Sequence, residues 1–196
     1  MARNKIPSAL SLAILGITSL EPVSGYDIRK IFRATPMGHF STSPGAIYPA
    51  LKRLEESGLI KGQIEKKNIL RPKRIYTLTN AGQETLKETL VQPVTHQDVV
   101  WRLEEMILRF AFTGNLLGRE QSFRFLNELA FHIDEYMPTL RENLNIQRKL
   151  KNINGAYAVE QGIAKYEATA RWARRVIKEL EKRRLAKNRN RAGGKT

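Results

Sequence analysis

The stretch SPGAIYPALKRLEESG, residues 43–58, decides the fold, because it holds a helix start signal, two faces and a stop signal. Ser43 can cap a helix, and Pro44 suits the first helical position, where a missing N–H costs no hydrogen bond. Gly58 can adopt the left-handed backbone conformation with which many helices end. The stretch therefore predicts one short helix between these signals.

Pro49 leaves the start of this helix open between two alternatives. If Ser43 is the cap, Pro49 removes the backbone hydrogen bond to the carbonyl of Gly45. A helix that begins near Ala46 loses no such bond. The sequence is compatible with both starts.

The side chains of this predicted helix divide into two faces. Ile47, Leu51 and Leu54 recur at helical spacing and form a narrow apolar stripe. The opposite face carries aromatic, proline and basic residues, namely Tyr48, Pro49, Lys52 and Arg53. A basic and aromatic face behind a buried stripe is what a helix needs to read DNA in the major groove.

A hairpin is predicted directly after this helix. Residues 59–65 read as a strand, and residues 74–79 alternate and are rich in β-branched and aromatic residues, which is typical of a second strand. Residues 66–70 form a polar, basic turn between them. The hairpin has one acid, Glu65, and six cations: Lys61, Lys66, Lys67, Arg71, Lys73 and Arg74. A loop so charged is usually only solvated, but directly after a reading helix it predicts the wing of a winged-helix domain.

Composition excludes several classes of protein. The chain of 196 residues has a formal net charge of +15, which indicates a polyanionic partner, either nucleic acid or an anionic membrane surface. It has no cysteine, which excludes disulfides and thiolate metal sites and fits a reducing cytoplasm. No apolar run approaches the roughly 20 residues of a membrane span. No small-residue cleavage site follows the apolar residues 9–20, so a signal peptide is not expected.

The sequence shows no pattern of catalytic or metal-binding residues. His39, His96 and His132 are far apart and have no carboxylate or cysteine partners at ligand spacing, so we expect no metal site and no cofactor. A Gly-rich phosphate loop, a nucleophile motif and paired catalytic carboxylates are also missing from the sequence. The chain is therefore not expected to be an enzyme.

Two more helices are predicted before the reading helix. Residues 8–17 are apolar on every side, which predicts a mostly buried helix that ends before Glu21-Pro22. Ser24 can cap a further helix over residues 25–32, with Asp27 in the capping-box position.

Three motifs carry a resemblance to a known family: SGYDI at residues 24–28, SPGAIYPALKRLEESGLI at 43–60 and RIYTLTNAG at 74–82. Together with the Leu-rich first helix they resemble the PadR family of winged-helix transcriptional regulators, over about residues 8–90. The resemblance implies a cytoplasmic prokaryotic homodimer that binds a palindromic operator. It also implies that Tyr48 and Lys52 lie at the DNA, with Tyr26 near the phosphates or supporting that face.

Two apolar seams are predicted in the C-terminal half. Residues 123–144 and residues 159–180 carry apolar side chains that alternate by three and four positions, and Pro138 predicts a kink within the first seam. The second seam is similar, less specifically, to the terminal helix of the longer PadR subfamily, whose C-terminal helices build the dimer. The dimer interface expected from both seams consists of Phe123, Leu126, Ile133, Met137, Val159, Ile163, Tyr166, Ala170, Trp172, Ala173 and Ile177.

The sequence therefore predicts a mainly α protein with a small two-stranded β wing. A winged helix-turn-helix domain is expected in residues 1–93, an antiparallel helical dimerisation domain in 94–185, and a basic, disordered tail in 186–196. Trp101 is expected to be either a packing residue or a wall of an effector pocket, and the effector itself is not identified.

The predicted function is a sequence-specific DNA-binding transcriptional regulator, a repressor that acts as a homodimer on double-stranded operator DNA. The alternative is an architectural or RNA-associated basic protein that binds nucleic acid without sequence preference. The residues expected to contact DNA are Tyr26, Ser43, Gly45, Tyr48, Pro49, Lys52, Arg53, Lys66, Lys67, Arg71, Lys73 and Arg74.

Overall fold

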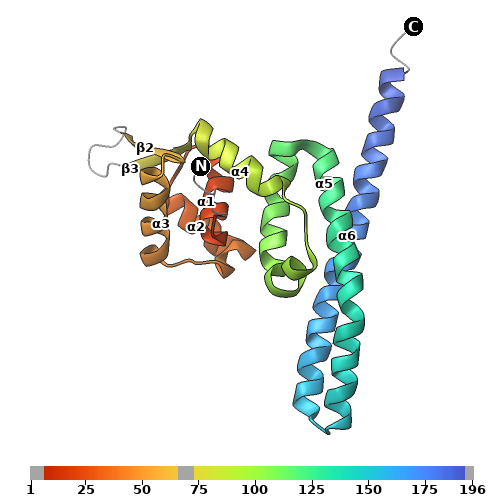
Figure 1. Ribbon diagram of the computed structural model, residues 1–196. Helices are drawn as coiled ribbons and strands as arrows, with labels where there is room; N and C mark the ends of the chain where they lie inside the picture. Colours follow the sequence, from red (N-terminus) through yellow and green to blue (C-terminus); the bar gives the residue numbers. More distant parts are fainter. Residues whose placement is uncertain (1–6, 66–72, 193–196) are drawn as a thin grey trace, which may run out of the picture. The chain divides into compact units, whose positions relative to one another are not determined.

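The computed structural model describes residues 7–65 and 73–192, and the chain divides into two compact units, Met1–Gln92 and Pro93–Thr196. Figure 1 shows the elements of both units. The first unit contains α1 (Ala9–Thr18), β1 (Val23–Ser24), α2 (Gly25–Ala34), the 3-10 helix η1 (Pro36–His39), α3 (Pro44–Glu56), β2 (Ile60–Glu65), β3 (Lys73–Leu78) and α4 (Asn80–Val91). The second unit contains α5 (His96–Lys149) and α6 (Ile153–Ala192).

Side-chain caps define the starts of the first helices. The Ser8 hydroxyl accepts a hydrogen bond from the N–H of Ser11, and the Ser24 hydroxyl accepts one from the N–H of Asp27. The Ser24 hydroxyl also donates to the Asp27 carboxylate at 2.5 Å. Helix α1 is buried from Leu12 to its end, as its apolar sequence predicts.

The structure decides between the two possible starts of α3. Ser43 is the cap, because its hydroxyl accepts from the N–H of Gly45 at 3.2 Å, and Pro44 begins the helix. Pro49 therefore lies inside α3 and removes one backbone hydrogen bond. The predicted exit is confirmed, since Gly58 has a φ of 70°.

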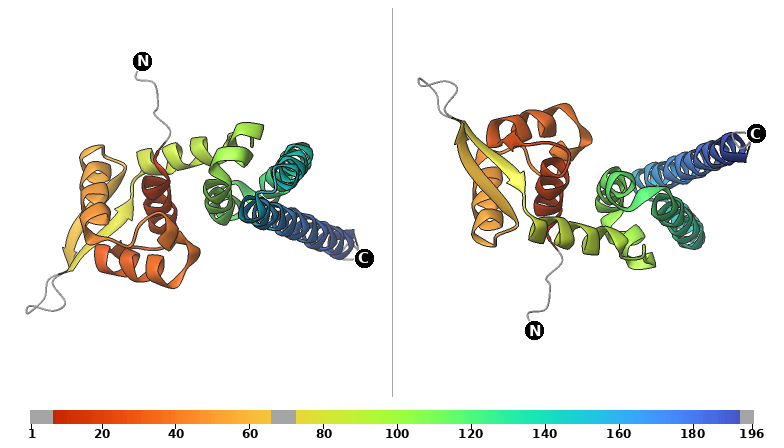
Figure 2. Two further views of the ribbon diagram at one scale, coloured as in Figure 1. Left: turned by 90° about the horizontal axis from the view of Figure 1, so that it is seen from below. Right: turned by 90° about the horizontal axis from the view of Figure 1, so that it is seen from above.

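The expected two-stranded wing is confirmed as β2 and β3, and β1 adds a third strand, giving an antiparallel sheet in the order β1-β3-β2. Residues Ile60–Glu65 pair with Lys73–Leu78, and β1 adds the pair of Val23 with Tyr76 on the other edge of β3. The two residues of β1 are too few to show an alternating pattern, so the sequence does not predict this strand. Figure 2 shows the ribbon formed by β2 and β3.

The core of the first unit is formed by the three helices of the motif and by α4. Fully buried side chains come from α1 (Ile14, Leu15), α2 (Ile28, Phe32), α3 (Ile47, Leu51) and α4 (Leu86, Leu90). The first unit is thus a winged helix whose apolar stripes all point to one core.

Gly82 lets α4 approach the strand that follows α3. A Cβ atom at this position would lie 2.0 Å from the carbonyl oxygen of Leu59. The same carbonyl accepts hydrogen bonds from the N–H and the hydroxyl of Thr79, and Thr79 caps α4. The close packing of α4 therefore depends on the missing side chain of Gly82.

In the second unit, α5 contains two residues with non-helical backbone angles, Arg102 and Gly118. The turn within α5 lies at Gly118, whose φ is 80°. Thr113 stays helical and buried, with its hydroxyl donating to the carbonyl of Arg109. The helix continues through Pro138, as expected.

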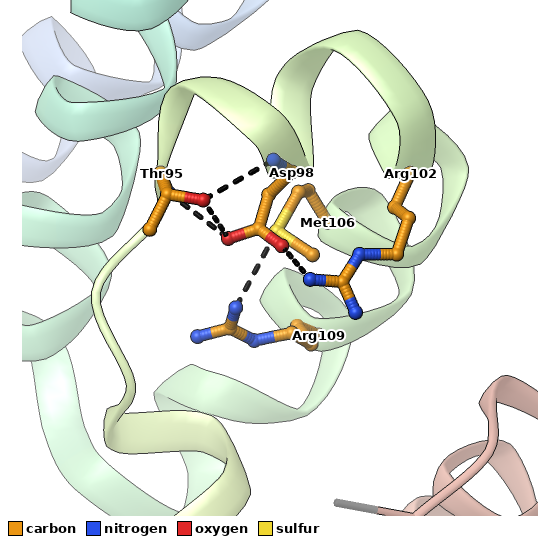
Figure 3. A network of polar contacts seen from close by, with 5 residues as sticks. All are labelled: Thr95, Asp98, Arg102, Met106 and Arg109. Carbon is orange, nitrogen blue, oxygen red and sulfur yellow. Dashed lines mark hydrogen bonds and ion pairs between the residues drawn. The ribbon is translucent and has the colours of Figure 1, made fainter.

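A polar network surrounds the first break in α5 (Figure 3). Thr95 and Asp98 form a capping box, and the Asp98 carboxylate also accepts a hydrogen bond from Arg102. Burial alone would raise the pKa of Asp98, but the hydrogen bonds from Thr95 and the charge of Arg102 lower it below its ordinary value. Arg109 as a whole residue is only 6% exposed, and its guanidinium lies over the ring of Phe125, 5.3 Å from the centroid. Burial lowers the pKa of Arg109.

Helices α5 and α6 form an antiparallel hairpin (Figure 1), and they fill their apolar seams with each other. Two core clusters lie between them, one around Phe125, Ile133 and Ala170 and one around Leu126 and Ala173. Of the residues assigned from sequence to a dimer interface, the clusters of this single chain contain Leu126, Ile133, Met137, Ile163, Tyr166, Ala170, Trp172, Ala173 and Ile177. These residues thus pack inside one protomer, and their part in a contact between copies stays a prediction. Phe123 and Val159 lie partly exposed outside the clusters.

Two of these aromatic residues show the packing most clearly. The Tyr166 hydroxyl donates to the carbonyl of Val99 at 3.1 Å and so joins α6 to the start of α5. The ring of Trp172 contacts Phe110 edge-on, with 5.3 Å between ring centroids. Both side chains therefore stabilise the fold of the hairpin itself.

Helix α6 extends to Ala192, into the segment that was expected to be a disordered tail. Lys, Arg and Ala are good helix formers, so a run of them can continue a helix although it lacks acidic partners. Among the described residues, no helix has the length and apolar character needed to cross a membrane.

Replacing Gly82 with Ala should lower the free energy of unfolding of the first unit by about 1–3 kcal/mol, because the new methyl group overlaps a backbone oxygen. Urea denaturation followed by circular dichroism measures the change. Gly162→Ala is the matched control, since nothing lies within 4 Å of its added Cβ in α6, and it should stabilise by about 0.5–1 kcal/mol. Equal effects of both substitutions would contradict the packing described here.

Candidate nucleic-acid interface

The outer face of α3 carries the side chains that sequence reasoning assigned to DNA. Tyr48 is 47% exposed, and Pro49, Lys52 and Arg53 are exposed as well. Ile47, Ala50, Leu51 and Leu54 are buried on the inner face. The helix therefore has one anchored face and one accessible, basic and aromatic face.

Lys52 has one ion-pair partner, Glu56, at 3.7 Å on the next turn of α3. Both side chains are mostly exposed, and exposed pairs of this kind contribute at most about 1 kcal/mol. A phosphate or a base edge can therefore replace Glu56 as the partner of Lys52 at little cost.

The start of α2 lies against the outer face of α3. A Cβ atom at Gly25 would lie 2.7 Å from Cε1 of Tyr48, so the Tyr48 ring packs directly on this glycine. Tyr26, the next residue, is 59% exposed. The structure therefore places the start of α2 against Tyr48 of α3. Ser43 and Gly45 are exposed at the start of α3.

The wing adds exposed cations on its two described strands. Lys61 lies on β2 and Lys73 begins β3, and both are exposed. Sequence reasoning also named Lys66, Lys67 and Arg71, which lie outside the described residues.

Arg74 differs from the other wing cations, because its guanidinium donates a hydrogen bond of 2.6 Å to the Glu55 carboxylate at the end of α3. It also lies over the Tyr76 ring, 6.0 Å from the centroid. The Arg74 guanidinium is thus directed towards α3, and the DNA contact expected of this residue stays a prediction.

The Glu55 carboxylate joins α3 to both strands of the wing. Besides Arg74 of β3, its Oε1 atom accepts a hydrogen bond of 2.9 Å from the N–H of Gly62 in β2. A Cβ atom at Gly62 would lie 2.8 Å from Oε1 and 2.4 Å from Nε of Arg74, so a larger residue here would require both side chains to shift. We call these three residues the Glu55 clamp.

Electrostatics keep the Glu55 clamp charged. The hydrogen bond from Arg74 is the main reason why the pKa of Glu55 lies below its ordinary value. Because the pKa of Glu55 is lower in the folded than in the unfolded protein, its carboxylate stabilises the fold. This contribution is fully present above the unfolded pKa and is lost as the pH falls through the folded pKa. Sequence reasoning missed Glu55, since its partners are 7 and 19 residues away.

Trp101 is 81% exposed on α5. It therefore neither packs into the core of its own unit nor forms the wall of a closed cavity within a single chain. Its assignment to an effector pocket stays a prediction.

Comparison with known proteins agrees with this arrangement of elements. Residues 14–88, which run from within α1 to within α4, match the family described as "Transcriptional regulator PadR-like family". The negative transcriptional regulator PadR of Bacillus subtilis (strain 168) is 29% identical over 149 residues, 76% of this chain and 72% of that protein. The transcriptional regulator YqjI of Escherichia coli (strain K12) is 35% identical over 83 residues, 42% of this chain and 38% of that protein.

Among solved structures, the crystal structure of Bacillus subtilis PadR in complex with operator DNA is 22% identical, with a TM-score of 0.42 over 88% of this chain and 99% of that one. The match to the family over residues 14–88 covers the three-helix motif together with the wing. Over residues 14–88 this chain is therefore similar to the PadR-like family of transcriptional regulators.

Proposed function

We propose that this regulator binds double-stranded DNA in a sequence-specific manner through α3 and the wing. The observation that carries the proposal is the two-faced helix α3, whose basic and aromatic outer face is free while its inner face is buried. Tyr48, Lys52 and Arg53 contact base edges and phosphates in the major groove, because an exposed helix of this kind fits that groove. Tyr26 and Lys73 contact the adjacent backbone.

The Glu55 clamp determines how α3 and the wing meet the duplex together. A hairpin joined to the reading helix at both strands presents its cations at a fixed position relative to the groove. Phosphate contacts made from a fixed position set the register of the reading helix, although they carry no sequence information themselves.

The proposed regulator acts as a homodimer on a palindromic operator. Since the apolar seams are used within one chain, we place the contact between copies at the turn of the α5–α6 hairpin. Exposed large apolar side chains gather there: Ile146, Leu150, Ile153 and Tyr157. A group of exposed apolar side chains of this kind is typical of a protein–protein contact.

We also propose that the outcome of DNA binding is repression. The name of the Bacillus subtilis relative, a negative transcriptional regulator, supports this sign of regulation. A repressor on operator DNA acts in the cytoplasm of a prokaryotic cell. A small-molecule effector would act by shifting the population of dimers that fit the operator.

Selection of bound duplexes from a random pool should yield an enriched inverted repeat, and Lys52→Ala should then lose specificity for it. If Lys52 reaches a base edge, the difference in binding free energy between operator and random duplex falls by about 1–3 kcal/mol. Fluorescence anisotropy with both duplexes measures the ratio. Lys87→Ala, which removes the same charge from the exposed side of α4, is the control and should keep the ratio.

Two outcomes would contradict the proposed function. A pool without enrichment would favour the basic architectural protein that binds any duplex or RNA. A Lys52→Ala protein with an unchanged ratio would mean that α3 docks on DNA through another face.

Glu55→Gln should reduce the ratio of operator to random-duplex affinity, because it weakens the hydrogen bonds that fix the wing on α3. Affinity for random duplex should stay equal or rise, since a negative charge near the phosphates is removed. Glu56→Gln makes the same charge change one residue further along α3 and should keep or improve operator binding. A reduced ratio for Glu56→Gln and an unchanged one for Glu55→Gln would refute the role of the clamp.

The double variant Leu150→Glu/Tyr157→Glu should sediment as a monomer at concentrations where the wild type is a dimer, because two carboxylates cannot be buried in an apolar contact. Circular dichroism should be unchanged, since both side chains are exposed. Gln161→Glu on α6 serves as the control and should remain a dimer. A wild-type monomer at micromolar concentration, or a dimeric double variant, would exclude this contact.

A further inference from the structure

Two histidines and a glutamate converge at one place on the second unit. His96 is the first residue of α5, whereas His132 and Glu135 lie on the part of α5 that follows the break at Gly118. One ligand atom of each residue lies within 4.8 Å of the other two. We propose that His96, His132 and Glu135 bind a divalent transition-metal ion of the zinc type.

The distances between the ligand atoms bracket those of a metal site. His132 Nδ1 lies 2.7 Å from Glu135 Oε2, and His96 Nδ1 lies 4.0 Å from the same oxygen. Ligands at about 2.0–2.1 Å in a tetrahedral zinc site are separated by about 3.3 Å. Small rotations of the three side chains, of which His96 and Glu135 are exposed and His132 is partly buried, would bring these atoms to bonding distance.

The position of His96 is fixed before any ion binds. Its neighbour Thr95 forms the capping box with Asp98, and the N–H of Val94 donates to the Glu128 carboxylate at 2.9 Å. The His96 ring also contacts the ring of Tyr136 edge-on, with 5.9 Å between centroids. The start of α5 is thus attached to the later part of the same helix close to the three ligands.

The second histidine is held in a similar way. The His132 ring contacts Phe131 edge-on at 5.1 Å between centroids and lies 6.3 Å from the His96 ring. Because aromatic side chains flank both imidazoles, the ligands lose little conformational freedom when an ion binds.

The donor set indicates the class of metal. Two imidazole nitrogens and one carboxylate oxygen suit Zn²⁺, Ni²⁺ or Co²⁺ and are a poor set for Mg²⁺ or Ca²⁺, which prefer oxygen. Three protein ligands leave a fourth tetrahedral position for water or a small ligand. The Glu135 carboxylate offsets part of the charge of the ion.

A plain ion pair between His132 and Glu135, three residues apart on one helix, does not account for the third ligand. His96 lies 36 positions before His132 in the chain, and it approaches the same carboxylate oxygen. The sequence-based expectation of no metal site rested on this separation, which the return of α5 at Gly118 removes.

We expect each chain to bind one zinc ion. Competition with a chromogenic chelator, on the untagged protein of 196 residues, measures this stoichiometry. His96→Gln and His132→Gln should each weaken zinc binding more than about tenfold, because each removes a ligand. The chain has only three histidines and no cysteine, so His39→Gln is a matched control that should bind zinc like the wild type.

Two further readouts separate a metal site from a structural role of the histidines. Zinc should raise the melting temperature of wild type and His39→Gln, but not of the two ligand variants, which should melt like wild type without zinc. Co²⁺ should give the intense visible bands of a tetrahedral site in wild type and in His39→Gln, but not in His96→Gln or His132→Gln. The proposal would be overturned if the wild type did not bind zinc, or if His132→Gln bound zinc as tightly as the wild type.

Discussion

The hydrogen bonds of the Glu55 carboxylate are the constraint on which the DNA-facing part of the molecule depends. One oxygen at the end of α3 accepts from Arg74 in β3 and from the N–H of Gly62 in β2. These hydrogen bonds join α3, which carries Tyr48 and Lys52, to the two strands that carry the wing cations. The Arg74 guanidinium is directed to Glu55 in this arrangement.

Much of the winged unit could be predicted from the sequence, because its signals are local. Ser43 and Gly58 mark the ends of α3, and the spacing of Ile47, Leu51 and Leu54 defines which face is buried. Exposure of the opposite face follows from the same periodicity. Even the position of Pro49 inside the helix follows once Ser43 is known to be the cap.

Features that depend on contacts between distant residues could not be predicted in this way. Arg74 resembles its basic neighbours in sequence, and only the fold shows that Glu55, 19 residues earlier, accepts its hydrogen bond. The two C-terminal seams are regular whether they pack within one chain or between two, so periodicity could not distinguish a hairpin core from a dimer interface. The approach of His96 to His132 likewise requires the turn at Gly118.

The most direct measurement of the central claim is a double-mutant cycle on operator affinity between Glu55→Gln and Lys73→Ala. If the Glu55 clamp positions the wing, Lys73→Ala should cost less affinity in the Glu55→Gln protein than in wild type, since a displaced wing has already lost the phosphate contact. The two substitutions are then non-additive. An equal cost of Lys73→Ala in both proteins would show that the wing finds its phosphates without Glu55 and would contradict the account.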